Sequence, residues 1–284
     1  MSELIKISND FLEVKISTKG AELKSIVKDG RQMLWQGDPD VWSGQAPVLF
    51  PICGGVKDGK YILGGKEYFL EKHGFAKNSE FEVEAAEKDR VVFLLKSTAE
   101  TIEKYPFEFE FRAIFSLEDN KLKVQYAITN LANKDMYCGV GGHEAYACPE
   151  GVEAYSIVFD QAEDLHANLI EDGYVSRKTQ CMGKGIKELP LKNEYFAIDA
   201  IILFNLKSRK AALKNMETGE MVKLDFDGND FFLIWTKPGA KYVCLEPWST
   251  APDFSDSDYD FIKKDGSIII PPKNTTTKTH TIEF

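Results

Sequence analysis

The chain has 284 residues, of which 43% are hydrophobic, so it can bury a large core in one domain or two. Its formal net charge is −10, and no run of Lys and Arg appears, which argues against a nucleic-acid partner because phosphate backbones require clustered basic side chains. No stretch approaches the roughly 20 apolar residues of a membrane span, and residues 1–6 do not resemble a signal peptide, so we expect neither a membrane protein nor a secreted one.

The number and spacing of the cysteines also indicate where the protein resides. Their number is odd and no two have the close spacing of a zinc motif, so the sequence predicts neither a disulfide framework nor a cysteine-based metal site. A reduced, cytoplasmic environment fits this usage best. The five are Cys53, Cys138, Cys148, Cys181 and Cys244.

Hydrophobic residues alternate with polar ones through much of the chain, for example over residues 12–16, 107–115 and 122–128. This period of two is typical of antiparallel strands with one buried face and one wet face. Turn-forming residues separate such segments at short intervals, and no long amphipathic helix is indicated. The turns are expected at residues 28–31, 63–66, 118–121 and 217–220.

Many short strands without a repeating period favour a large β-sandwich over a propeller. No linker rich in Pro, Gly or Ser divides the chain, so we predict one all-β domain over residues 1–284. In such a sandwich, loops and strand ends from distant parts of the sequence can converge on one cleft.

Two of the four histidines lie beside glycines. His73 stands in the segment KHGFA at residues 72–76, and His143 ends the segment GVGGH at residues 139–143. Glycine leaves room for a ligand or another backbone to approach, and imidazole titrates near neutral pH. His143, with three glycines before it, is predicted to be functional, whereas His73 taken alone is more typical of a surface or half-buried turn histidine.

A glutamate is the third candidate site residue, beside these two histidines. Glu246 follows the apolar segment 242–245, and Pro247 is expected to end that strand. A partly desolvated carboxylate has a raised pKa and is a better base. The alternative is a salt bridge at a strand end. Trp248 suits either the CH face of a sugar or the core.

Other suggestive features are read as structural. The acidic segment 256–260 lacks the glycine and glutamate of a calcium loop, so we expect a solvated loop. His166 and His280 have no suggestive neighbours and are expected at the surface.

Several short segments, in this order, resemble the aldose 1-epimerase (galactose mutarotase-like) superfamily, and in particular its LacX-type branch. The resemblance covers most of the chain. The segments are WQGD at 35–38 with Trp42, APVLFPICG at 46–54, HGFA at 73–76, GH at 142–143, YFAIDA at 195–200 and EPW at 246–248.

The resemblance implies a single β-supersandwich and an isomerase that needs no metal or cofactor. It implies that Glu246 is the general base on the anomeric hydroxyl and that His143 is the general acid on the ring oxygen. His73 would orient the sugar, and Asp199 would bind its hydroxyls. The implied partner is a small sugar. The number of subunits is left open.

Two positions depart from the family pattern. Many relatives place a sugar-contacting arginine after the Pro-x-x-Gly segment, where this chain has Gly55. Lys57 or Lys77 is the candidate replacement, although lysine lacks the planar fork of arginine. Relatives also often have proline after the site histidine, where this chain has Glu144, a carboxylate that would raise the pKa of His143 if it were close.

The sequence therefore predicts a cytoplasmic epimerase (mutarotase) that interconverts the α and β anomers of an aldose or related sugar. A non-catalytic sugar-binding or sugar-sensing protein is the main alternative, favoured by Gly55. Glycoside hydrolysis by Asp199 and Glu246 ranks lowest, because it gives neither histidine a role.

Overall fold

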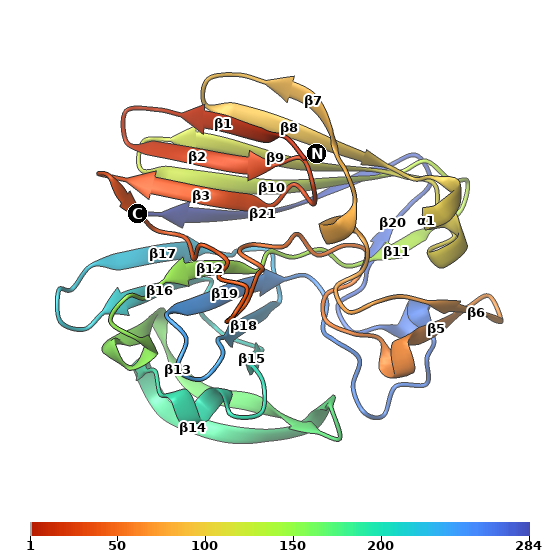
Figure 1. Ribbon diagram of the computed structural model, residues 1–284. Helices are drawn as coiled ribbons and strands as arrows, with labels where there is room; N and C mark the ends of the chain where they lie inside the picture. Colours follow the sequence, from red (N-terminus) through yellow and green to blue (C-terminus); the bar gives the residue numbers. More distant parts are fainter. Residues whose placement is uncertain (1) are drawn as a thin grey trace.

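The fold is almost entirely antiparallel β-structure, seen in a computed structural model that describes residues 2–284 (Figure 1). The predicted all-β sandwich is confirmed. Its upper half in Figure 1 contains β1–β3, β7–β10 and β21, and its lower half contains β12–β19. The assignment of the chain to one domain stays a prediction.

A small sheet begins the chain and packs on a larger one. Its four strands run in the order β1-β2-β3-β4, and their apolar side chains share one core with those of β8 and β9. The strands are β1 (Leu4–Ser8), β2 (Leu12–Ser17), β3 (Leu23–Lys28) and β4 (Arg31–Gln32).

A sheet of 13 strands forms most of the molecule and passes from the lower half to the upper half where β17 pairs with β21. Its order is β12-β19-β18-β15-β13-β16-β17-β21-β10-β9-β8-β7, and β14 pairs with β13. The bounds are β7 (Glu82–Ala86), β8 (Arg90–Lys96), β9 (Phe109–Glu118), β10 (Lys121–Asn130), β12 (Glu144–Ala147), β13 (Tyr155–Glu171), β14 (Tyr174–Pro190), β15 (Ile201–Phe204), β16 (Lys210–Asn215), β17 (Met221–Asp225), β18 (Phe231–Trp235), β19 (Tyr242–Trp248) and β21 (Thr275–Glu283).

The remaining elements are short. Two small pairings are β5 (Lys60–Leu63) with β6 (Lys66–Phe69) and β11 (Met136–Cys138) with β20 (Ile268–Ile270). Over residues 2–284, α1 (Ala99–Lys104) is the one α-helix, and no helix there has the length and apolar character needed to cross a membrane. The 3₁₀ turns are η1 (Lys57–Gly59), η2 (Ala76–Asn78), η3 (Val152–Ala154), η4 (Asn193–Phe196) and η5 (Phe261–Lys263).

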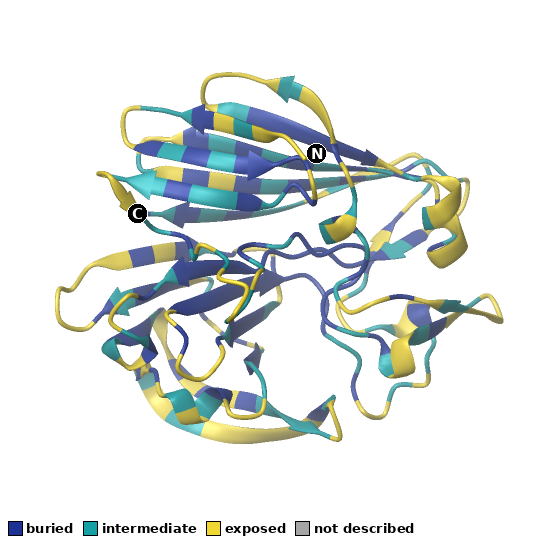
Figure 2. Cartoon of the chain, in the orientation of Figure 1, coloured by how far each residue is buried: buried dark blue, intermediate teal, exposed yellow. Residues whose placement is uncertain are grey.

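The period-two pattern produces this architecture directly. Along β9, buried residues alternate with half-buried ones, and Phe109, Phe111 and Phe115 all face the core. Burying an aromatic ring removes a large apolar area from water, so these rings favour the sandwich strongly. The two halves close over this core, and the strands in the middle of the lower half are buried along most of their length (Figure 2).

Candidate active site

Strand β19 carries the carboxylate of the candidate site. Successive side chains of a strand point to opposite faces. Val243 and Leu245 enter the main core, whereas Cys244 and Glu246 belong to the opposite face. The strand also runs through Pro247 to its end at Trp248, so the prediction that the proline stops it is wrong by one residue. Glu246 is therefore fixed within a paired strand and is only 2% exposed.

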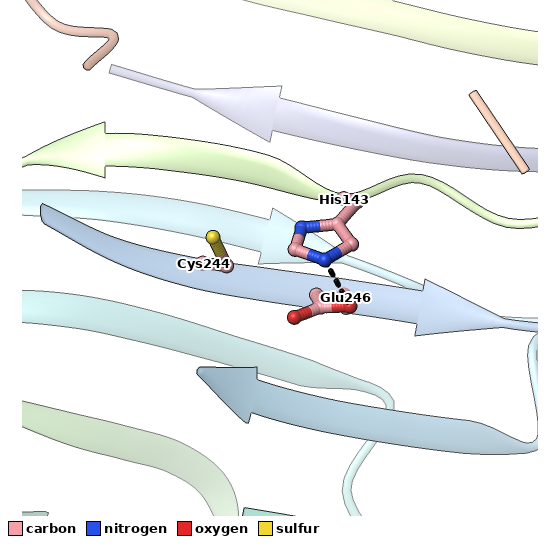
Figure 3. Close-up of side chains that lie close together, drawn as sticks. All are labelled: His143, Cys244 and Glu246. Atoms are coloured by element: carbon pink, nitrogen blue, oxygen red, sulfur yellow. Dashed lines mark ion pairs between the residues drawn. The ribbon is translucent and has the colours of Figure 1, made fainter. Parts of the chain in front are cut away.

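The sheet register places His143 opposite this carboxylate. Glu144 pairs with Leu245, so the residue before Glu144 stands across from Glu246. His143 Nε2 lies 3.3 Å from Glu246 Oε2 (Figure 3), and the histidine is 7% exposed. Two residues that are 103 positions apart in sequence thus become a cross-strand pair on one face.

Glu144 faces away from His143. Neighbouring residues of a strand point to opposite faces, and Glu144 enters the core, where its Oε1 lies 2.8 Å from His280 Nε2. His280 is 2% exposed. The predicted surface position of His280 is therefore wrong, while His166 is exposed as predicted. Glu144 does not contact the imidazole of His143 and acts instead as a link between β12 and β21.

The glycines before His143 make room for the protein itself. A Cβ on Gly141 would lie 2.5 Å from Trp248 Cδ1, and a Cβ on Gly142 would lie 2.5 Å from Glu144 Oε2. Gly74 behaves in the same way, because a Cβ there would lie 2.3 Å from the carbonyl oxygen of Phe50. The idea that these glycines give clearance to a ligand is wrong: they let β12, β19 and their loops pack closely.

His73 reaches the site from another loop. Its backbone is left-handed at φ 70°, and its Nδ1 accepts a hydrogen bond from the Gly54 amide at 3.1 Å. The proton of the neutral imidazole is then on Nε2, which leaves a donor for a ligand oxygen. The ring packs edge-on against those of His143 and Trp248, with centroid distances of 5.5 Å in both cases.

All four sequence-predicted site residues line one cleft of about 1090 Å³: His73, His143, Asp199 and Glu246. This volume is ample for a sugar-sized ligand. Asp199 follows η4 near Ile198, which is 80% exposed, and its Oδ2 lies 3.9 Å from Lys72 Nζ. The lysine and the aspartate are both partly exposed, so this pair contributes little to stability and its groups can turn to a ligand.

The cleft offers lysines where relatives are expected to have arginine. Gly55 lines it, and a Cβ at that position would touch nothing within 4 Å. Lys57 is outside the cleft lining, since its ammonium donates to the carbonyls of Ser255 and Ser257. Lys77 lines the cleft, so it fits the predicted replacement better than Lys57 does.

Two tryptophans that the sequence analysis did not assign to the site pack against His143. Trp42 lies against its imidazole at 5.3 Å between centroids, and Trp235 packs edge-on at 5.7 Å. Both line the cleft. Trp235 pairs with Cys244 across β18 and β19, a register that the alternation of β18 alone does not reveal. These rings hold the imidazole and exclude water from it.

Burial sets the protonation of the couple. Loss of hydration raises the pKa of Glu246 well above its ordinary value; Lys72 opposes the rise, and the charges of Asp199 and Glu144 add to it. Loss of hydration likewise lowers the pKa of His143. The pair therefore holds one proton over a wide pH range, and moving that proton across the 3.3 Å contact leaves its net charge unchanged.

His73 is also held neutral. Burial lowers its pKa well below the ordinary value, and the nearby His143, Lys72 and Lys77 lower it further. A neutral imidazole with its proton on Nε2 is suited to donating a hydrogen bond rather than to carrying charge.

Among the described residues, His143, Cys244 and Glu246 are the group of donors close enough to hold a metal ion. Burial raises the pKa of the Cys244 thiol well above its ordinary value, so the thiol is protonated in this arrangement. Without a metal, the chemistry that the site offers is proton transfer between a carboxylate and an imidazole beside polar groups that can hold a hydroxylated ring.

The chain belongs to the aldose 1-epimerase family, whose model matches residues 3–283. The predicted resemblance is confirmed.

Individual relatives support the same family assignment. The chain is 34% identical over 260 residues to the plasmid-encoded Protein LacX of Lactococcus lactis subsp. lactis, covering 86% of this chain and 87% of that protein. A galactose mutarotase related enzyme from Lactobacillus acidophilus has a TM-score of 0.94 at 31% identity, over 99% of this chain and 97% of that one. A galactose mutarotase-like protein from Lactobacillus casei has a TM-score of 0.93 at 27% identity, over 99% of both chains.

Proposed function

We propose that this protein is a sugar epimerase that interconverts the α and β anomers of an aldose or related sugar. The observation that carries the proposal is the 3.3 Å contact between His143 Nε2 and Glu246 Oε2 inside the cleft. The anomeric hydroxyl and the ring oxygen are bonded to the same carbon, so an acid and a base that act on them must lie close together. Membership of the aldose 1-epimerase family supports the same reaction.

The roles follow from the protonation of the couple. At rest, the raised pKa of Glu246 and the lowered pKa of His143 place the shared proton on Glu246. Transfer of that proton across the 3.3 Å contact gives the working form, in which His143 is protonated and Glu246 is ionised. Glu246 removes the proton from the anomeric hydroxyl while His143 protonates the ring oxygen, and the ring opens to the aldehyde. Rotation about the C1–C2 bond and the reverse transfers close the other anomer and restore the couple. Lys72 favours the ionised form of Glu246, because it is the cation that opposes the rise of that pKa.

The other two residues hold the ring. His73 donates from Nε2 to a sugar oxygen, since its Nδ1 is engaged by Gly54. Asp199 accepts hydrogen bonds from sugar hydroxyls at the cleft wall. Trp248, which also lines the cleft, offers an apolar face to the CH groups of the ring.

The test is the interconversion of freshly dissolved α-glucose and α-galactose, within a broader sugar panel, followed by polarimetry or exchange NMR. Wild type should accelerate it, and Glu246→Gln should slow turnover by about 10²–10⁴-fold, the usual contribution of a positioned proton-transfer group. Glu163→Gln is the matched control, because Glu163 is equally buried but bonds the Ser208 amide outside the cleft.

Equal rates for wild type and Glu246→Gln across the panel would refute the enzymatic proposal. Sugar binding by calorimetry without any acceleration would select the sugar-binding alternative instead. Release of a chromogenic aglycone from a glycoside would select hydrolysis.

A further inference from the structure

A third donor lies beside the proposed proton-transfer couple. Cys244 and Glu246 are two residues apart on β19 and share a face, and His143 stands across from Glu246 (Figure 3). One donor atom from each residue lies within 4.8 Å of the other two. All three residues are buried; Cys244 and Glu246 lie in β19, and His143 directly precedes β12.

The spacing is close to that of a metal site. Tetrahedral zinc, with bonds of 2.0–2.3 Å to nitrogen, oxygen and sulfur, holds its ligand atoms about 3.3–3.6 Å apart. The 3.3 Å between His143 Nε2 and Glu246 Oε2 already matches this range. The donor atoms lie within 4.8 Å of one another, so the thiol of Cys244 must approach by about 1.5 Å at most, which a side-chain rotation provides.

The donors are chemically free to bind. His143 Nδ1 is buried without a hydrogen-bond partner, and the contact of Nε2 is with Glu246, which is itself one of the three donors. Glu246 is a buried carboxylate, and Lys72, Asp199 and Glu144 are the charged groups that act on it, one cation and two anions. A divalent cation held by one thiolate and one carboxylate makes a neutral unit, which suits a desolvated pocket.

We propose that a thiophilic divalent cation such as Zn²⁺ binds to His143, Cys244 and Glu246 and switches the protein off. The cation enters through the cleft, which His143 and Glu246 line. The thiol proton leaves to the solvent as the sulfur–metal bond forms. Metal binding does not depend on the proposed epimerase activity, whereas the inhibition rests on it.

The binding test uses Co²⁺ as a coloured substitute for Zn²⁺ on protein first stripped with a chelator. Wild type should show a thiolate-to-cobalt charge-transfer band and the intense visible bands of tetrahedral cobalt. Cys244→Ala should lack the charge-transfer band and bind at least about tenfold more weakly, since loss of a second-shell partner alone costs 10–100-fold. Cys138→Ala, which removes a buried thiol on β11, should behave as wild type.

No charge-transfer band in wild type, or an unchanged band in Cys244→Ala, would overturn the proposal. Cys244→Ser serves as a second variant if the alanine variant is unstable, and its spectrum should likewise lack the charge-transfer band.

The kinetic test adds Zn²⁺ to the anomer assay. With each protein compared with its own metal-free rate, wild type should be inhibited, and Cys244→Ala should require at least about tenfold more Zn²⁺ for half-inhibition. Equal inhibition of both proteins contradicts a thiolate ligand. If no sugar is turned over at all, the proposed function fails, and the cobalt spectra still decide the metal site.

Discussion

Gly141→Ala is the change that most directly tests why glycines precede the site histidine. The added Cβ would lie 2.5 Å from Trp248 Cδ1 and 3.0 Å from the carbonyl oxygen of Pro247. Gly141 is also fixed by backbone hydrogen bonds with Leu49, so the strain cannot be relieved by moving the glycine alone. Overpacking of this kind costs about 1–3 kcal/mol of the free energy of unfolding.

The same shift should reach His143, two residues along. A displacement of about 1 Å at a catalytic group can cost on the order of 10²-fold in rate, so we expect a large fall in kcat for the folded variant. Urea denaturation gives the stability change, and the anomer assay gives kcat. Gly55→Ala is the control, because a Cβ there meets nothing within 4 Å; it should leave stability equal to wild type or slightly higher.

If Gly141→Ala were as stable and as active as wild type, the space beside Gly141 would not be needed by Trp248. The close packing of β19 against the segment before β12 would then not be what positions the imidazole.

Three further changes test the proposed sugar contacts. His73→Asn keeps a residue that tolerates left-handed backbone but removes the Nε2 donor, so KM should rise by about 3- to 10-fold, the value of one hydrogen bond, with a smaller change in kcat. Asp199→Asn should leave the unfolding midpoint unchanged, because its pair with Lys72 is exposed, yet raise KM by about tenfold or more through loss of a charged acceptor; an unchanged KM would remove Asp199 from the site. Gly55→Arg should be tolerated in a thermal melt and should lower KM if the planar fork reaches the sugar; a raised KM would show that the open space itself admits the ligand.

Alternation in the sequence predicted the fold well, because burial of one strand face is a local property. Phe109, Phe111 and Phe115 are separated by even numbers of residues, so they share one face of β9, and all three are buried. His280 was expected at the surface because it has no suggestive neighbours in the sequence, and this was wrong because its burial depends on a partner, Glu144, that is 136 residues away. A buried polar pair leaves no periodic trace in either strand.

The site was predictable only in part. Residue types and order suggested Glu246, His143, His73 and Asp199, and the structure places all four on one cleft. The contact between His143 and Glu246 depends on the register of β12 with β19, which neither segment specifies alone.

The purpose of the glycines could not be inferred either. Adjacent glycines signal close approach, but they do not say whether the neighbour is a ligand or, as at Gly141, the ring of Trp248. Cys244 was likewise read only as a free thiol, because its nearness to the couple follows from the same cross-strand register.

The central claim is that Glu246 and His143 act as one couple that shares a single proton. A double-mutant cycle with Glu246→Gln, His143→Gln and the double variant, measured by exchange NMR on the sugar that wild type turns over fastest, tests it most directly. Residues that act as a unit are non-additive, so the double variant should be no slower than the slower single variant. If the rate loss of the double variant equalled the product of the two single losses, the two residues would act independently, and the account would be contradicted.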